Sequence, residues 1–121
     1  MTYRRWRESV THAWRGIRYV FRHEQNFRIQ CAIAISVVAL GIFLGLSKSE
    51  LILILLLIFS VLVLELLNSA IEAYADAVTP RLSPHVEAVK DIMAAAVLCA
   101  SVGSLFIGAL IFLPRMIEVF F

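Results

Sequence analysis

Three apolar stretches, separated by short polar connections, dominate the pattern of this chain. They cover about residues 29–46, 51–75 and 94–113. A helix needs about 20 apolar residues to cross the hydrocarbon core of a bilayer, and in lipid it has to satisfy its own backbone hydrogen bonds. We therefore expect three transmembrane helices. A tight turn at 47–50, with Ser47 or Ser49 as helix cap, follows the first, and Pro80 and Pro84 break the chain after the second.

A different period marks the N-terminal residues. Apolar side chains recur there in steps of three and four, which places them in one stripe along a helix. They are Trp6, Val10, Ala13, Trp14, Ile17, Val20 and Phe21. The pattern predicts an amphipathic helix over about residues 3–23, whose flanking arginines can reach headgroup phosphates. We expect this helix to lie flat on the membrane surface, with a plain membrane anchor as the alternative.

Composition narrows the class of protein. Of the 121 residues 61% are hydrophobic and 17% are charged, and the mean hydropathy is +0.88. A soluble domain has about 45–50% apolar and about 25% charged residues, and a chain this apolar cannot stay disordered in water. Residues 1–121 therefore form one all-α integral membrane domain. Cys31 and Cys99 lie in apolar stretches, so we expect small buried hydrophobes there, not a disulfide or a metal pair.

The distribution of cations predicts the orientation. Seven of the eleven are arginines within the first 28 residues. Because apolar side chains interleave with them, they favour a surface of anionic lipid over nucleic acid. With the N-terminus inside, Arg81 and Lys90 join these seven, while Lys48 and Arg115 remain outside. We therefore expect a cytoplasmic N-terminus and an outward C-terminus.

The second apolar stretch carries polar residues on one helix face. Glu65, Asn68, Glu72 and Asp76 follow one another at steps of three, four and four, within an arc of about 80°. At about 1.5 Å per residue, Glu65 lies about 22 Å beyond Glu50, inside the hydrocarbon. A carboxylate at such a depth costs about 2.5–3.5 kcal/mol. Two interpretations follow: a catalytic site, or polar residues that hold helices of an oligomer together.

Further charged residues are expected near the cytoplasmic end of these helices. Glu24 precedes the first span, and Lys90 and Asp91 precede the third. Carboxylates hold Mg²⁺ together with substrate phosphates, a lysine neutralises a transferring phosphoryl group, and a carboxylate can accept the proton of an attacking hydroxyl. The sequence has no P-loop, glycine-rich kinase loop or serine–histidine–acid set, and its three histidines lack metal-ligand spacing. Phosphoryl transfer is thus favoured over a non-catalytic channel or scaffold.

Several short runs form a recognisable set. They are Trp14-Arg15-Gly16-Ile17-Arg18, Glu24-Gln25-Asn26-Phe27-Arg28, the run Glu65-Leu66-Leu67-Asn68-Ser69-Ala70-Ile71-Glu72 with Asp76, and Lys90-Asp91 with Ala94-Ala95-Ala96-Val97-Leu98. Over about residues 5–113 this set resembles the prokaryotic diacylglycerol kinase family, which includes the undecaprenol kinases. The resemblance implies a homotrimer in the bacterial cell membrane, with active sites shared between subunits at its cytoplasmic face. It also implies phosphorylation of a membrane lipid alcohol, diacylglycerol or undecaprenol, by ATP with Mg²⁺.

The resemblance assigns a role to each matching residue. Glu65 is the expected general base, and Glu24 and Glu72 are the expected Mg²⁺ ligands beside the nucleotide. The remaining nucleotide-binding residues would be Asn68, Lys90, Asp91 and Arg5, and the lipid would meet Trp14, Arg15, Arg28, Ala94 and Glu65.

One tripeptide departs from the family pattern. Many members have Glu-Tyr-His where this chain has Arg81-Leu82-Ser83, which leaves the preference between ATP and GTP open. Thr79-Pro80 and the later Pro84 resemble the undecaprenol kinase branch more closely.

Overall fold

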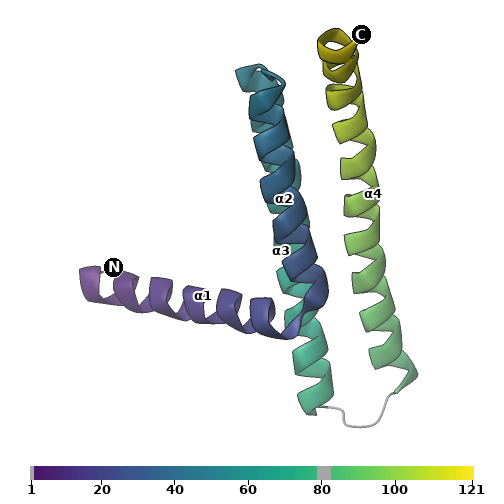
Figure 1. Cartoon of the computed structure of the whole chain (residues 1–121). Coiled ribbons are helices and arrows are strands. Elements are labelled where there is room, and N and C mark those ends of the chain that lie inside the picture. The colour runs from purple at the N-terminus through teal and green to yellow at the C-terminus, as the bar shows by residue number, and fades with distance from the viewer. Residues whose placement is uncertain (1, 79–82) are drawn as a thin grey trace.

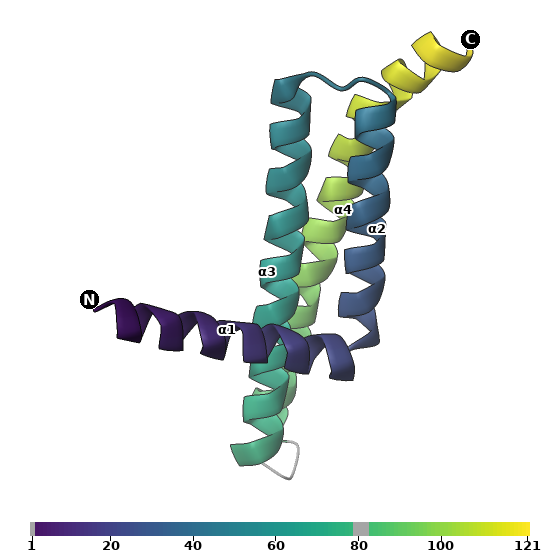
Figure 2. The ribbon, with the colours of Figure 1, turned by 60° about the vertical axis from the view of Figure 1, so that its left-hand side comes forward.

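The computed structural model describes residues 2–78 and 83–121, and four helices contain nearly all of them. They are α1 (Tyr3–His23), α2 (Gln25–Phe43), α3 (Lys48–Val78) and α4 (Pro84–Phe120). Helices α2, α3 and α4 run alongside one another, with α3 contacting both of the others (Figure 1). Helix α1 lies across them, near the end of the bundle where α2 begins, and extends beyond α3 (Figure 2).

Three of the helices are long and apolar enough to cross a membrane, as expected. Most of their large apolar side chains are exposed in the single chain; Leu105 is 74% and Leu110 76% exposed. The buried apolar residues are few, and Phe27 and Ile54 are the most enclosed. A surface of this kind suits lipid or further protein and does not suit water.

The limits of all three long helices differ from the predicted spans, and α3, predicted over about 51–75, runs from Lys48 to Val78. The first apolar stretch was expected to run through residue 46, but α2 begins at Gln25 and ends at Phe43. The third was expected to end at 113, but α4 continues through Pro114 to Phe120. Figure 2 shows the last turns of α4 leaving the bundle direction. A proline removes one backbone donor and crowds the preceding turn, so α4 bends near Pro114 and still continues as a helix.

The end of α2 is set by a glycine. Gly45 has a φ of 72°, which glycine adopts without the steric cost of a Cβ atom. The amide of Leu46 donates to the carbonyl of Gly41 at 3.0 Å, and that of Gly45 donates to Ile42 at 3.1 Å. These two bonds make the Schellman closure of a helix. The hydropathy of Leu44 and Leu46 concealed this turn, so the predicted span ended three residues too late.

The turn between α2 and α3 is tied to the far end of α4. Ser47 Oγ accepts a hydrogen bond from the amide of Glu50 at 3.2 Å, and Glu50 Oε1 accepts one from the amide of Ser47 at 3.0 Å. This reciprocal pair is a capping box, and it confirms Ser47 as the cap. Arg115 Nη2 donates to the same Glu50 oxygen at 2.7 Å. The ion pair therefore holds the C-terminal part of α4 against the start of α3.

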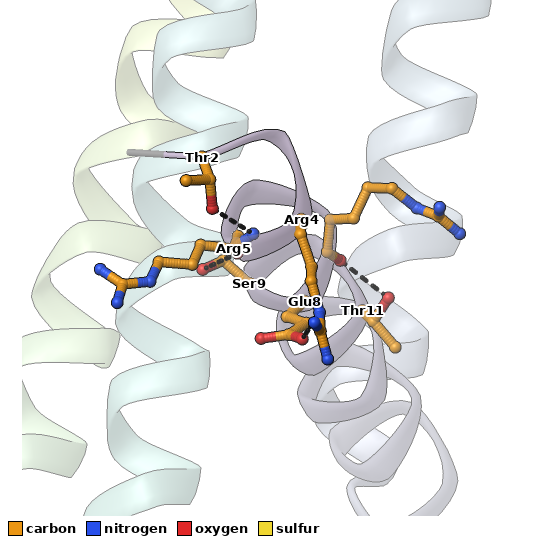
Figure 3. Close-up of polar contacts among 7 residues, drawn as sticks. Thr2, Arg4, Arg5, Glu8, Ser9 and Thr11 are labelled. Carbon is orange, nitrogen blue, oxygen red and sulfur yellow. Dashed lines mark hydrogen bonds and ion pairs between the residues drawn. The ribbon is translucent and has the colours of Figure 1, made fainter.

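Helix α1 is stabilised by contacts within itself. Thr2 Oγ1 accepts from the amide of Arg5, Ser9 and Thr11 donate to carbonyls four residues earlier, and Arg4 pairs with Glu8 at 3.4 Å (Figure 3). All of these groups are exposed in the single chain. The helix predicted over about residues 3–23 is confirmed, whereas its place on a membrane surface stays a prediction.

The closure at Gly45 can be tested by substitution. Gly45→Ala forces a Cβ atom into the left-handed region and should lower the free energy of unfolding by about 1–2 kcal/mol. Gly45→Asn should cost less, because asparagine tolerates that region. The measurement is reversible unfolding of the purified protein in mixed micelles. Equal stability of Gly45→Ala and the parent would mean that the turn does not need a positive φ.

Candidate functional site

The least exposed ionisable group of the described residues is Glu65, in the middle of α3. It is only 2% exposed, and the residues on either side of it along the helix, Leu64 and Leu66, are apolar. Helix α3 continues for three turns beyond it, to Val78. An ionisable side chain in such a position is expensive and commonly functional.

Three polar side chains influence the Glu65 carboxyl group electrostatically. The Gln30 amide on α2 does so through a hydrogen bond, and the carboxylates of Glu24 and Glu72 do so through the repulsion of like charges. The Gln30 Oε1 and Asn68 Oδ1 atoms are buried, and neither has a hydrogen-bond partner among the residues that the structure describes. Buried polar atoms are satisfied in most proteins. Gln30 on α2 and Asn68 on α3 therefore each carry a buried acceptor that the described residues leave unpaired.

Glu24 lies at the corner between α1 and α2. Its backbone is extended, with φ −114° and ψ 110°, and it belongs to neither helix. The amide of Glu24 donates to the carbonyl of Val20 at 2.8 Å, which ends α1, while its own carbonyl accepts from Arg28 at 3.4 Å, which begins α2. This single residue therefore turns the chain from the crossing helix into the bundle.

A second polar contact joins α4 to the same face of α3. Lys90 Nζ and Asp76 Oδ1 are 2.7 Å apart. The Asp76 side chain is 69% exposed, and such exposed pairs contribute little stability, about 0–1 kcal/mol. Lys90 can thus leave Asp76 and bind another anion at a small cost in free energy. Asp91, the next residue on α4, is exposed. Arg81 and Leu82, where the sequence departs from the family pattern, lie outside the residues that the structure describes.

The polar side chains around Glu65 suit a divalent cation only in part. Within residues 2–78 and 83–121, no three histidine, cysteine, aspartate or glutamate side chains are grouped as a metal site. Mg²⁺ needs no such cage, because it keeps several waters and binds through one or two carboxylates together with substrate phosphates. Glu24 and Glu72, whose charges both repel a charge on Glu65, are the two carboxylates that could serve in this way.

The residues expected around the lipid lie apart from one another. Trp14 and Arg15 are exposed on α1, and Ala94 is exposed on α4. Arg28 is occupied by α1, since its Nη1 donates to the carbonyls of Phe21 at 2.7 Å and Arg22 at 3.0 Å. Arg5 belongs to the first turn of α1. The N-terminal turns of α1 project beyond the bundle (Figures 1 and 2), away from the middle of α3, which carries Glu65.

Two apolar hollows lie among the helices. One, of about 480 Å³, lies between α1 and α3, where Ala13, Gly16 and Ile17 face Ser69 and Ala70. The other, of about 500 Å³, lies among α2, α3 and α4 and has Gln30 in its lining. Gln30 therefore stands between an apolar hollow and the buried carboxyl group.

Two contacts near Glu65, that of Gln30 and that between Lys90 and Asp76, were not predicted from the sequence. Gln30 is the one amide within the predicted span 29–46, and that position was the available signal. The pairing of Lys90 with Asp76 had no such signal, because it joins residues on different helices.

The sequence comparisons agree on one family. The family model described as prokaryotic diacylglycerol kinase matches residues 11–112. A protein of Bacillus subtilis named undecaprenol kinase is 43% identical over 109 residues, covering 90% of this chain and 89% of its own. A Synechocystis protein named diacylglycerol kinase is 32% identical over 91% of this chain and 63% of its own, and one from Escherichia coli is 28% identical over 77% and 76%.

Proposed function

Because the chain belongs to the prokaryotic diacylglycerol kinase family, we propose that it phosphorylates a membrane lipid alcohol with ATP at the cytoplasmic face of the membrane. The observation that carries the proposal is the buried Glu65, with Glu24, Glu72 and Gln30 acting on it. The same side chains would be a costly way to hold helices together, since apolar residues would pack α3 without the penalty.

Each polar residue has a place in the reaction. The lipid hydroxyl attacks the terminal phosphorus of ATP, its proton passes to the Glu65 carboxylate, and ADP leaves. Lys90, released from its exposed pair with Asp76, would bind a phosphate of the nucleotide. Asn68 and Asp91 would hold ATP from α3 and α4. A base in reach of the hydroxyl contributes about 10²–10⁴-fold to such a rate.

A magnesium ion would be held by Glu24 and Glu72. It would neutralise charge on the phosphates, which is its usual contribution to phosphoryl transfer. The two carboxylates come from the α1–α2 corner and from α3, so both elements have to keep their relative position.

The assembly that we propose is a homotrimer with sites completed by neighbouring subunits. The large exposed apolar area of α2–α4 and the unpartnered atoms of Gln30 and Asn68 support it. Arg5 belongs to the N-terminal turns of α1, which project away from the bundle (Figure 2), and would then reach the nucleotide of a neighbour. The cation distribution supports a cytoplasmic N-terminus and an outward C-terminus in the bacterial cell membrane.

Of the two lipids, undecaprenol is the one that we propose as preferred. The relative with 43% identity over 90% of this chain is named for it, and the match extends over almost the whole of both proteins. The tripeptide difference at 81–83 bears on the nucleotide and not on the lipid.

The direct experiment is transfer of labelled phosphate from ATP to diacylglycerol and to undecaprenol, measured side by side in mixed micelles. We expect a labelled product with both lipids and a higher kcat/KM with undecaprenol. Transfer to diacylglycerol alone would refute the lipid preference. Transfer to neither lipid would refute the function and leave helix packing as the role of Glu65.

The metal ligands can be tested separately from phosphate binding. Glu24→Ala and Glu72→Ala should each raise the Mg²⁺ concentration needed for half-maximal activity, because each removes a carboxylate ligand. Lys90→Met is the contrast: it should raise the KM for ATP and leave the Mg²⁺ requirement of the nucleotide complex unchanged. A glutamate variant with parental Mg²⁺ and ATP binding would show that this residue is not a ligand.

The role of α1 can be tested at Trp14. If the helix lies in the interface and admits lipid, Trp14→Ala or Arg15→Ala should lower activity at a low mole fraction of lipid, with ATP saturating. Binding of the nucleotide should survive, because Lys90, Asn68 and Glu72 lie on other helices and Arg5, although on α1, is unchanged in both variants. Unchanged dependence on lipid mole fraction in both variants would reduce α1 to an anchor, which three spans hardly need.

A further inference from the structure

Arg28 stands one turn beyond Glu24 and reaches back across the corner between α1 and α2. Its Nη1 atom donates to two carbonyls at the end of α1, that of Phe21 at 2.7 Å and that of Arg22 at 3.0 Å. The last carbonyls of a helix have no partner within the helix, and a basic side chain can satisfy them. One guanidinium group thus links the end of α1 to the first turn of α2.

An apolar contact closes the other side of the same corner. The rings of Phe21 and Phe27 meet edge to face, with centroids 6.5 Å apart and planes at 89°. Phe27 is only 4% exposed, so this contact belongs to the small core of the single chain. Phe21 therefore takes part twice, through its ring with Phe27 and through its carbonyl with Arg28.

The residue that these contacts enclose is Glu24. Its extended backbone and its two backbone hydrogen bonds, to Val20 and from Arg28, define the corner. Its side chain makes no capping hydrogen bond to α2 among the residues that the structure describes. The direction of the Glu24 carboxylate therefore depends on the angle between the two helices, which Arg28 and the two phenylalanines set.

We propose that Arg28 is a positioning residue, which holds the α1–α2 corner so that Glu24 faces Glu65 and Glu72 as a metal ligand. The proposal rests on the proposed function, in which Glu24 holds Mg²⁺. It replaces the expectation that Arg28 meets the lipid substrate: its described hydrogen bonds go to α1 carbonyls.

Arg28→Met tests the assignment, because it keeps the apolar stem and removes the donors. Groups that orient metal ligands commonly contribute 10–100-fold to metal affinity. We expect the Mg²⁺ concentration for half-maximal activity to rise by about 10-fold or more, with the KM for lipid unchanged. Arg28→Lys, which keeps donors on a more flexible stem, should recover part of the loss. Arg22→Met is the matched control, since Arg22 takes part only through its backbone carbonyl.

Two readouts do not depend on turnover. Binding of Mn²⁺, followed by electron paramagnetic resonance with a non-hydrolysable ATP analogue, should weaken in Arg28→Met and not in Arg22→Met. Hydrogen exchange of the Glu24 amide, which donates to Val20, should accelerate in Arg28→Met alone.

The outcomes separate the two proposals. A raised KM for lipid with parental Mn²⁺ binding would overturn the positioning role and return Arg28 to the lipid substrate. Unchanged exchange of the Glu24 amide would show that Arg28 does not hold the corner. A parent protein that phosphorylates no lipid would instead overturn the proposed function, while the exchange measurement would still report on the corner.

Discussion

The structure depends on one constraint: a carboxyl group, Glu65, lies almost fully buried in the middle of an apolar helix. Removing such a group from water costs several kcal/mol unless other polar groups compensate. In this chain three other polar side chains influence it electrostatically: Gln30 on α2, Glu24 at the α1–α2 corner, and Glu72, two turns further along α3. The apolar lengths of the three long helices hold this cluster near one end of the bundle.

The contacts that hold the helices lie at the two ends of the bundle. At one end Ser47, Glu50 and Arg115 join the start of α3 to the far part of α4. At the other end Arg28 and the Phe21–Phe27 pair set the corner at Glu24, and Lys90 meets Asp76. Between the two ends, the surfaces that α2, α3 and α4 turn toward one another are apolar and leave a hollow of about 500 Å³. This division leaves the middle of the molecule to lipid or to a neighbouring subunit and keeps the charged residues at defined levels.

The sequence allowed the four helices to be predicted, because their lengths and periods follow from the bilayer and from helix geometry. It also placed Glu65, Asn68 and Glu72 on one face, since spacing along a helix determines direction. The turn at Gly45 was concealed by the apolar residues on both sides of it. The partners of Arg28, Lys90 and Arg115 were not predictable, because a hydrogen bond between helices depends on the angle and the register at which those helices meet. Residues 79–82 lie outside the described structure, so the difference from the family pattern at Arg81 and Leu82 stays an observation on sequence.

The most direct test of the central claim is the turnover of Glu65→Gln. Glutamine preserves the shape of the side chain and its hydrogen bonds but cannot accept the proton of the lipid hydroxyl. The measurement is kcat for lipid phosphorylation at saturating Mg·ATP, together with nucleotide binding and the size of the assembly. The account predicts a loss of about 10²–10⁴-fold in kcat, with nucleotide affinity and assembly as in the parent. Turnover close to that of the parent would contradict it, and would make the buried carboxyl group a structural contact between helices.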